Sequence, residues 1–486
     1  MSTALRPYAT TGVTLICAGL LAATPVSAAR PELVLRAVQL TAGQDVGLVV
    51  GGTGTPIPSP EYIAGGDAYI QRILPGAVSQ GVFTPEGGSP IYTGVKSLPF
   101  DTSFAQGTTI LTADIEQQVA AGNTVAVFGE SQSSTISGMV MPNLEADGVS
   151  ADAVKFVLVG DPSNPDGGLL ERFAGLSLPA LGITFSGATP PDTIYDTSIY
   201  TQEYDGFADF PKYTLNFLSD LNAFLGIEFV HPTYRDLTPD QINNAITLPT
   251  TSDYDGNTTY YMIPMADDQV LPLLRLFIPM ADDQVLPLLR LFEGIPLIGK
   301  PLVDLLNPAL TQIVNLGYDN PDNQGWDVGQ ANVPTTFGLF PSTAQLMTAM
   351  DNMGPALQQG FQAFLNDLTH PAPTADSSGA LSDLFAGSGA GGSLPSFSDI
   401  VNGLTSAFSQ GYATLLPQAD ILTSLLVNMP AYDISLFTQN LFSNPIDAIG
   451  LPLAADTGLL TLAAGIDLMV LQETASSIAS TLQGLF

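Results

Sequence analysis

A serine lies where a strand-like run gives way to a helix-like one. Residues 124–134 read TVAVFGESQSS, so an apolar run leads into Gly129-Glu130-Ser131-Gln132-Ser133. This is the strand, turn and helix context in which a Gly-x-Ser-x-Gly elbow exposes a nucleophilic serine. Because the backbone at such an elbow is strained, the residues two before and two after the serine must be small. Gly129 and Ser133 meet this requirement. An ordinary polar turn is the alternative, and the preceding apolar strand favours the catalytic interpretation for Ser131.

The chain has only two histidines, His231 and His370, so any serine–histidine mechanism must use one of them. Ser131, an aspartate and His231 follow one another in the chain order of α/β-hydrolase triads. Asp205 is the preferred acid and Asp209 the alternative, which spacing does not separate. His231 would accept the Ser131 proton and return it to the leaving group, although a packing role before a proline is also open. His370, in a proline-rich segment, is the weaker candidate for the base.

A second glycine-rich turn, GGTGTP at 51–56, follows an early strand-like run. In serine hydrolases the oxyanion is bound by the amide after the nucleophile, here Gln132, and by an amide from such a loop. Gly52 or Thr53 is predicted to supply the second amide. A phosphate-binding loop is the rival interpretation, but its lysine and the acidic residue of a dinucleotide site are missing from the pattern. We expect no cofactor.

The composition excludes several functions. The 486 residues are 45% apolar and carry 12 Lys+Arg against 46 Asp+Glu, a formal charge of −34. This charge repels nucleic acid and anionic lipid headgroups, so we expect no nucleic-acid partner, and any contact with envelope lipid would use apolar surface. A zinc site is not expected either, because two histidines without an H-x-x-x-H spacing are too few ligands.

The first 28 residues have the pattern of a signal peptide. Arg6 precedes an apolar run at 13–23, and small residues end at Ala28, where we expect cleavage. The run is shorter than the roughly 20 residues of a membrane-spanning helix. Since Cys17, the only cysteine, lies inside it, the mature chain would have no thiol and no disulfide. The sequence thus predicts an exported protein, secreted or bound to the cell envelope.

Strand-like runs alternate with helical patterns in the first part of the chain. The expected strands are 45–50, 124–128, 155–160 and 197–204, and Leu215, Leu218, Leu221 and Leu225 indicate one face of a helix. This alternation is typical of an α/β fold, a mainly parallel sheet flanked by helices.

The expected domains are a signal peptide (1–28), a hydrolase domain (45–320), a helical extension (321–368), a Pro/Gly/Ser-rich linker (369–396) and a helical C-terminal region of unknown role (397–486). Residues 263–277 are repeated without change at 278–292, and this Pro-punctuated stretch would form either a lid over the site or ordinary core helices. We interpret 458–471, which Asp467 interrupts, as a buried or amphipathic helix and not a membrane span.

Six ordered motifs resemble the PE-PPE domain of mycobacterial proteins: GGTGTPIPSPEYI (51–63), VFGESQSS (127–134), VGDPSNPDGGLLERF (159–173), YDGFADFP (204–211), FVHPTY (229–234) and LVDLLNPALTQIVNLGYDN (302–320). The resemblance implies a serine α/β-hydrolase fold related to cutinases, with Ser131 as nucleophile, Asp205 or Asp209 as acid and His231 as base. It implies a signal-peptide-bearing member without the PE or PPE module.

The resemblance also implies an acyl ester or glycolipid substrate. The expected activity is that of an esterase on fatty acyl lipids. The alternatives are an acyltransferase that moves fatty acyl groups between trehalose glycolipids, and a non-catalytic lipid-binding envelope protein.

Overall fold

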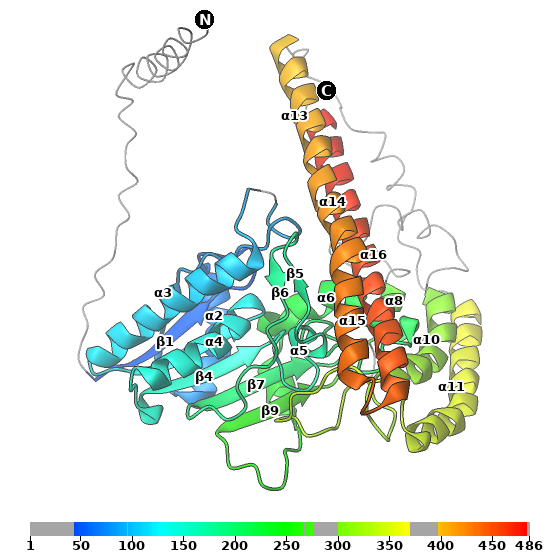
Figure 1. Ribbon diagram of the computed structural model, residues 1–486, viewed down its shortest axis with the longest axis horizontal. Coiled ribbons are helices and arrows are strands. Elements are labelled where there is room, and N and C mark those ends of the chain that lie inside the picture. The colour runs from blue at the N-terminus through cyan, green and yellow to red at the C-terminus, as the bar shows by residue number, and fades with distance from the viewer. Residues whose placement is uncertain (1–42, 95, 267–268, 276–299, 370–396, 484–486) are drawn as a thin grey trace, which may run out of the picture. The chain divides into compact units, whose positions relative to one another are not determined.

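Seven strands form one sheet in the order β2-β1-β3-β4-β7-β9-β8 (Figure 1). The computed structural model describes residues 43–94, 96–266, 269–275, 300–369 and 397–483. All neighbouring strands are parallel except β8 and β9, which pair antiparallel. The strands are β1 (Asp45–Val50), β2 (Val78–Val82), β3 (Thr124–Glu130), β4 (Val154–Val159), β7 (Asp196–Gln202), β8 (Ile246–Thr247) and β9 (Thr258–Ile263), and a separate hairpin pairs β5 (Ser177–Leu178) with β6 (Ile183–Thr184). The predicted α/β fold is confirmed.

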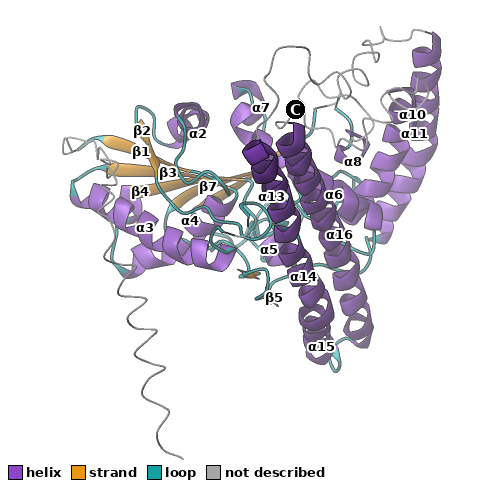
Figure 2. Ribbon diagram, turned by 90° about the horizontal axis from the view of Figure 1, so that it is seen from above, coloured by secondary structure: helices purple, strands orange, loops and turns teal. Residues whose placement is uncertain are grey.

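Strands β1, β3 and β4 are mostly apolar because helices cover both faces of the sheet, whereas β7, with the sequence DTSIYTQ, is more polar although buried. Along β3 and β4 successive side chains enter different clusters: Val127 and Phe156 pack in one, Phe128 and Val157 in the other. Helix α2 (Pro60–Ile73) packs on the second cluster, whereas α3 (Phe100–Ala120) and α4 (Gln132–Ala146) pack on the first. Figure 2 shows α2 on one side of the sheet and α3 and α4 on the other.

The helix expected from the leucine spacing is α6 (Phe217–Phe229), and it begins later than the pattern indicated. Leu218, Leu221 and Leu225 pack in or against the core, but Leu215 precedes the helix and is 38% exposed. The turn that ends at Asn216, the N-cap, therefore removes Leu215 from the apolar face. The remaining short helices of the sheet region are η1 (Ala151–Ala153), α5 (Leu169–Arg172), η2 (His231–Asp236), α7 (Pro239–Asn243) and α8 (Pro272–Arg275).

Helix α10 (Lys300–Val314) and η3 (Asn315–Gly317) fall in the expected hydrolase domain, and α11 (Thr343–Thr369) forms the later part of the expected extension. The C-terminal region is helical, as predicted, and contains α13 (Phe397–Ala413), α14 (Leu415–Thr423), a π-helical turn η4 (Ser424–Asn428), α15 (Met429–Asn440) and α16 (Pro445–Gln483). The stretch from α13 to α15 runs antiparallel to α16 (Figures 1 and 2). Helix α16 packs on α6, and the Thr214 hydroxyl donates to the Ala454 carbonyl at 2.6 Å.

Two helical stretches, Thr405–Asn440 and Pro445–Leu471, have the length and hydropathy of membrane spans. In the folded chain, 22% and 39% of their apolar 18-residue segments is buried. One side of α16 packs inward through Leu459 and Leu462, while Leu460 and Leu468 are half exposed. The inward side of α16 is buried, but its outward side is apolar too, so the helix is not amphipathic. That residues 458–471 do not span a membrane stays a prediction. The proposed signal peptide, the whole second repeat copy (278–292), His370 and nearly all of the linker lie outside the described residues.

A buried arginine ties the segment after residue 320 to the sheet region. Arg172 is fully buried and forms ion pairs with Asp166 and Asp327, and it also donates to the Thr335 carbonyl at 2.7 Å. A buried cation without such partners would have a high desolvation free energy. Asp327 and Thr335 must therefore pack beside Arg172. The residues that follow residue 320 therefore share the core of the hydrolase fold.

Candidate active site

Ser131 occupies the strained turn between β3 and α4. Its backbone has φ 59° and ψ −118°, a left-handed conformation that is unusual for a residue with a side chain. The Ser131 amide donates to the Val159 carbonyl at 3.0 Å, which fixes the turn against β4. A Cβ on Gly129 would lie 2.8 Å from the Ser133 carbonyl oxygen, so glycine is required there. The sharp elbow expected from the sequence is thus present.

Ser133, which replaces the second glycine of the usual elbow, is part of the turn's hydrogen bonding. Its hydroxyl accepts from the Glu130 amide at 2.8 Å and lies 3.0 Å from the Glu130 carbonyl and 3.2 Å from the Val50 carbonyl. The side chain is fully buried. The serine therefore fits the small space and also holds the end of β3 against the start of α4.

We expect Ser133→Gly to destabilise the protein by about 2 kcal/mol, because it removes two hydrogen bonds and adds backbone freedom. Urea unfolding of the two proteins measures this difference. Ser133→Ala serves as the comparison, since it loses the hydroxyl but keeps the Cβ. Equal stability of Ser133→Gly and the wild type would contradict the role given to the hydroxyl.

Asp205 and His231 form a hydrogen-bonded pair at the carboxyl end of the sheet. The His231 Nδ1 atom lies 2.9 Å from both Asp205 carboxylate oxygens. Asp205 follows β7, and His231 begins η2 directly after α6. Because Nδ1–H donates to the carboxylate, Nε2 carries the lone pair of the neutral ring. Nε2 is buried, has no hydrogen-bond partner among the described residues, and His231 and Ser131 line the same cavity.

Close packing sets the place of the imidazole. A Cβ on Gly160, at the end of β4, would come within 2.8 Å of the His231 Cε1 atom, and Gly160 has φ 57°. On the other side the Phe207 ring lies edge to face with the imidazole at 4.8 Å between centroids. Burial, the largest single effect, lowers the pKa of His231, but the Asp205 carboxylate together with the charges of Glu130 and Glu228 raises it above 6.5.

Asp205 has two further donors that the sequence analysis did not identify. The Tyr234 hydroxyl donates to Asp205 Oδ2 at 2.7 Å, and the Phe207 amide donates to Oδ1 at 3.0 Å. Tyr234 lies three residues after His231 in a 3₁₀ helix, where residues i and i+3 share one side. The spacing of His231 and Tyr234 within the motif FVHPTY (229–234) is the sequence feature that indicates this contact. The carboxylate is therefore fixed from three directions.

We expect Tyr234→Phe to lower kcat about tenfold while leaving KM nearly unchanged, because the hydroxyl orients the acid and does not contact the cavity. Steady-state kinetics on a soluble ester measures this. Tyr195→Phe is the matched control, since its buried hydroxyl donates to the Val149 carbonyl at 3.0 Å, away from the site. If both variants lose activity equally, Tyr234 has only a structural role.

The alternative acid, Asp209, does not contact His231. It is buried in the carboxylate group around Arg172, where burial, and then the neighbouring charge of Asp327, raise its pKa well above the ordinary value. Its Oδ2 atom has no hydrogen-bond partner among the described residues. The sequence does not separate Asp209 from Asp205 as the acid, because both follow the same strand. In the structure Asp205 is the one that is positioned to hydrogen-bond the imidazole.

The predicted oxyanion amides behave differently from one another. The Gly52 amide donates to the Tyr62 hydroxyl at 2.8 Å and is therefore engaged. Within the described part of the chain, no hydrogen bond occupies the amides of Thr53 and Gln132, and both residues line the cavity beside Ser131. Thr53 and Gln132 thus fit the oxyanion role better than Gly52.

The Gln132 side chain links the loops around these amides. It accepts from the Ser103 hydroxyl at 2.7 Å and donates to the Gly87 carbonyl at 2.9 Å and the Thr53 hydroxyl at 3.2 Å. Sequence reasoning used only the Gln132 backbone, because these partners lie 29 to 79 residues away. The network holds the two amides in one place before a substrate binds.

The cavity at Ser131 has a volume of about 320 Å³, the size of a small-molecule site. One end is polar: Arg235 Nε donates to Glu130 at 2.7 Å, and its guanidinium lies 4.2 Å from the Tyr62 ring centroid. Another part of the lining is apolar, with Phe100, Leu169, Phe207 and Ile227, although Glu228 also lines the cavity. In the part of the chain that is described, no cluster of three or more His, Cys, Asp or Glu side chains could hold a metal ion.

A mainly parallel sheet, a serine on a strand–helix elbow and a bonded His–Asp pair define an esterase-like α/β-hydrolase. The PE-PPE domain model matches residues 75–284 and 276–319, two segments that meet within the duplicated stretch. The chain belongs to the PE-PPE domain family.

Several known proteins are similar to this chain. The uncharacterized PPE family protein PPE28 of Mycobacterium tuberculosis is 41% identical over 96% of this chain and 72% of its own length. Esterase PE16 of the same organism is 38% identical over 87% and 79%. Diacyltrehalose acyltransferase Chp2, also from M. tuberculosis, is 24% identical over 60% and 85%. A solved cutinase-like protein from Cryptococcus sp. is 21% identical over 34% of this chain and 79% of its own, with a TM-score of 0.24.

Proposed function

We propose that the protein is an exported serine hydrolase that cleaves carboxyl esters of fatty acyl lipids through an acyl-Ser131 intermediate. One observation carries this proposal: His231 is bonded to Asp205 through Nδ1 and has a free Nε2 in the cavity that Ser131 lines. This is the arrangement that a base needs when it activates a serine.

The proposed reaction has two halves. His231 Nε2 takes the Ser131 proton as Oγ attacks the ester carbonyl, and the amides of Thr53 and Gln132 hold the oxyanion. The intermediate collapses, His231 protonates the departing alcohol, and the acyl group stays on Ser131. Water then attacks the acyl-serine with His231 again as base, which releases the fatty acid and restores the serine.

A fluorophosphonate probe tests the chemistry directly, because it phosphonylates only a serine that its site activates. We expect labelling of the wild type, shown by mass spectrometry of the Ser131 peptide. An unlabelled protein that also leaves short-chain esters intact would favour the third interpretation, a lipid-binding protein without catalysis.

An acyltransferase is the second candidate function, supported by the similarity to Chp2 and by the polar end of the cavity. Glu130, Arg235 and Tyr62 could hydrogen-bond a sugar hydroxyl that attacks the acyl-serine in place of water. The two activities differ in whether the closed site excludes water. Incubating an acyl trehalose with and without a second trehalose lipid separates them: free fatty acid indicates hydrolysis, and a more highly acylated product indicates transfer.

Export and contact with envelope lipid are further parts of the proposal. Support for export comes from the pattern of residues 1–28, and support for lipid contact comes from apolar side chains exposed on the C-terminal helices, including Phe408, Tyr412 and Phe442. Mass spectrometry of the secreted or envelope-bound protein should find an N-terminus at residue 29. An intact residue 1 in a cytoplasmic fraction would contradict export.

A further inference from the structure

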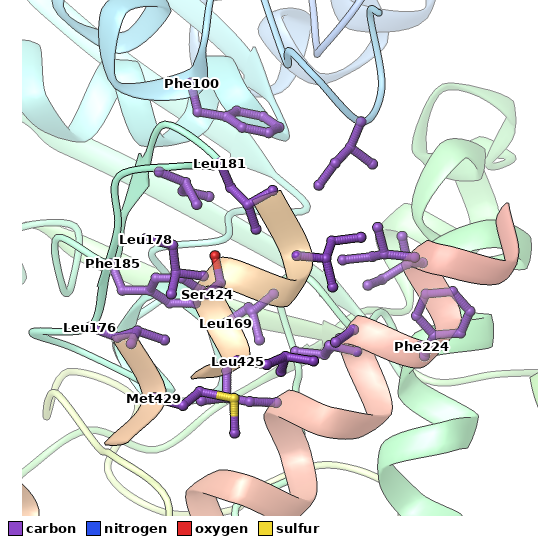
Figure 3. A pocket seen from close by; sticks show the side chains of 18 of the residues that line it. Phe100, Leu169, Leu176, Leu178, Leu181, Phe185, Phe224, Ser424, Leu425 and Met429 are labelled. Atoms are coloured by element: carbon purple, nitrogen blue, oxygen red, sulfur yellow. The ribbon is translucent and has the colours of Figure 1, made fainter. Parts of the chain in front are cut away.

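A second cavity adjoins the active site, between the hydrolase fold and the C-terminal helices (Figure 3). Its volume is about 110 Å³. Leu176, Leu178 and Phe185 come from the region of the β5–β6 hairpin, whereas Leu425 and Met429 come from η4 and the start of α15. Eight of the 20 residues that line this cavity, here called the apolar chamber, therefore come from the region for which the sequence indicated no role.

The chamber offers almost nothing to a polar ligand. Its lining is aliphatic and aromatic apart from the hydroxyls of Tyr92 and Ser424. The Ser424 hydroxyl donates to the Asp420 carbonyl at 2.9 Å within its own helix, so it needs no further partner. An apolar space of this kind remains dry or holds an apolar group.

The chamber and the active-site cavity share one wall. Six residues line both: Tyr92, Phe100, Leu169, Ile183, Phe207 and Ile227. Phe207 is the link to the catalytic groups, since its ring packs on His231 and its amide donates to Asp205. The chamber thus lies next to the apolar part of the active-site cavity, and Glu130, Arg235 and Tyr62 line only the active-site cavity.

We propose that the apolar chamber binds the acyl tail of the substrate, so that the C-terminal helices select the acyl chain while the polar end receives the alcohol. This inference rests on the proposed function. An ester with an apolar acid part and a polar alcohol part matches the two ends of the cavity. Each methylene buried in the chamber raises kcat/KM by up to about fourfold, until the small volume is filled.

Two isomeric esters test the orientation. Ethyl octanoate and octyl acetate have the same atoms, but only the first carries its long chain on the acyl side. We expect the wild type to prefer ethyl octanoate by about tenfold or more in kcat/KM. A preference for octyl acetate would overturn the proposal.

Adjacent leucines provide matched variants of the chamber. Leu425 lines it, whereas Leu426 is 67% exposed. Leu425→Trp should reduce the preference for ethyl octanoate about tenfold, and Leu426→Trp should retain it. Leu425→Ala, which enlarges the space, should instead improve ethyl decanoate relative to ethyl octanoate. If Leu425 and Leu426 variants show the same preferences, the chamber does not bind the acyl chain.

A binding measurement separates failure of this inference from failure of the proposed function. The Ser131→Ala protein is titrated with the fluorescent fatty acid cis-parinaric acid, alone and combined with Leu425→Trp or Leu426→Trp. Binding that only Leu425→Trp weakens, by about tenfold, supports the chamber even in a protein without esterase activity. Esters that are cleaved, with fatty acid binding that neither tryptophan changes, would support the hydrolase and overturn the chamber.

Discussion

Ser131→Ala is expected to lower kcat on a soluble ester by on the order of 10⁶-fold and to abolish fluorophosphonate labelling. The physical reason is that covalent catalysis has no other nucleophile at this place, while binding and the oxyanion amides remain. KM should change little. Initial rates with p-nitrophenyl butyrate, together with labelling of the same preparation, measure both effects.

Ser150→Ala is the control for that experiment. Ser150 is exposed and precedes β4, so it lies at the opposite end of the parallel sheet from Ser131. It should keep wild-type labelling and rate. If Ser131→Ala retains more than about a hundredth of the activity, or if label appears on another serine, Ser131 is not the nucleophile.

Asp205→Asn is expected to lower kcat by about 10⁴-fold, because the amide no longer holds the imidazole in the tautomer that leaves Nε2 free. The structure gives this residue its role through two 2.9 Å contacts with Nδ1. Asp209→Asn is the matched comparison. Because burial already raises the pKa of Asp209, the neutral amide should be tolerated there, and the variant should retain activity within about tenfold. The reverse ranking would make Asp209 the acid.

The pH dependence provides an independent check on the same pair. Only neutral His231 can act as a base, so the rate of the wild type rises with pH through the raised pKa of His231, above 6.5. In Asp205→Asn the strongest of the charges that raise the pKa of His231 is gone, while the burial and the weaker effects of Glu130 and Glu228 remain. The residual activity should therefore rise at lower pH than in the wild type. A profile of kcat/KM from pH 5 to 9 shows the shift, and a midpoint that moves upward would contradict it.

Local patterns were sufficient to predict the elbow and the chain order of the three proposed catalytic groups. Gly129, Ser131 and Ser133 are close in sequence, and their sizes alone restrict the turn. The strands at 45–50 and 124–128 could also be predicted from the sequence, because a strand buried on both faces is mostly apolar. By contrast β2, with the sequence VSQGV and largely unburied residues, shows no such run. Edge strands of this kind depend on pairing more than on composition.

The choice between Asp205 and Asp209 shows the limit of local information. Both aspartates follow β7 and both are buried, so neither composition nor burial separates them. The positive φ of Tyr204 and the turn after it direct Asp205 toward η2, whereas Asp209 faces Arg172. Similarly, the sequence indicates that the Gly52 amide could bind the oxyanion, but in the fold this amide donates to the Tyr62 hydroxyl.

The amino-acid sequence by itself determined a negatively charged α/β chain with a nucleophile elbow, two histidines and no cysteine beyond residue 17, because these properties depend on residue type and short spacing. Only the tertiary structure decided which carboxylate hydrogen-bonds the imidazole and which of the candidate oxyanion amides have no hydrogen bond. It also decided that Leu425 and Met429 line a chamber next to the cavity of Ser131, which lies almost 300 residues earlier in the chain. Contacts of such sequence separation arise from the packing of whole elements, which no local pattern encodes.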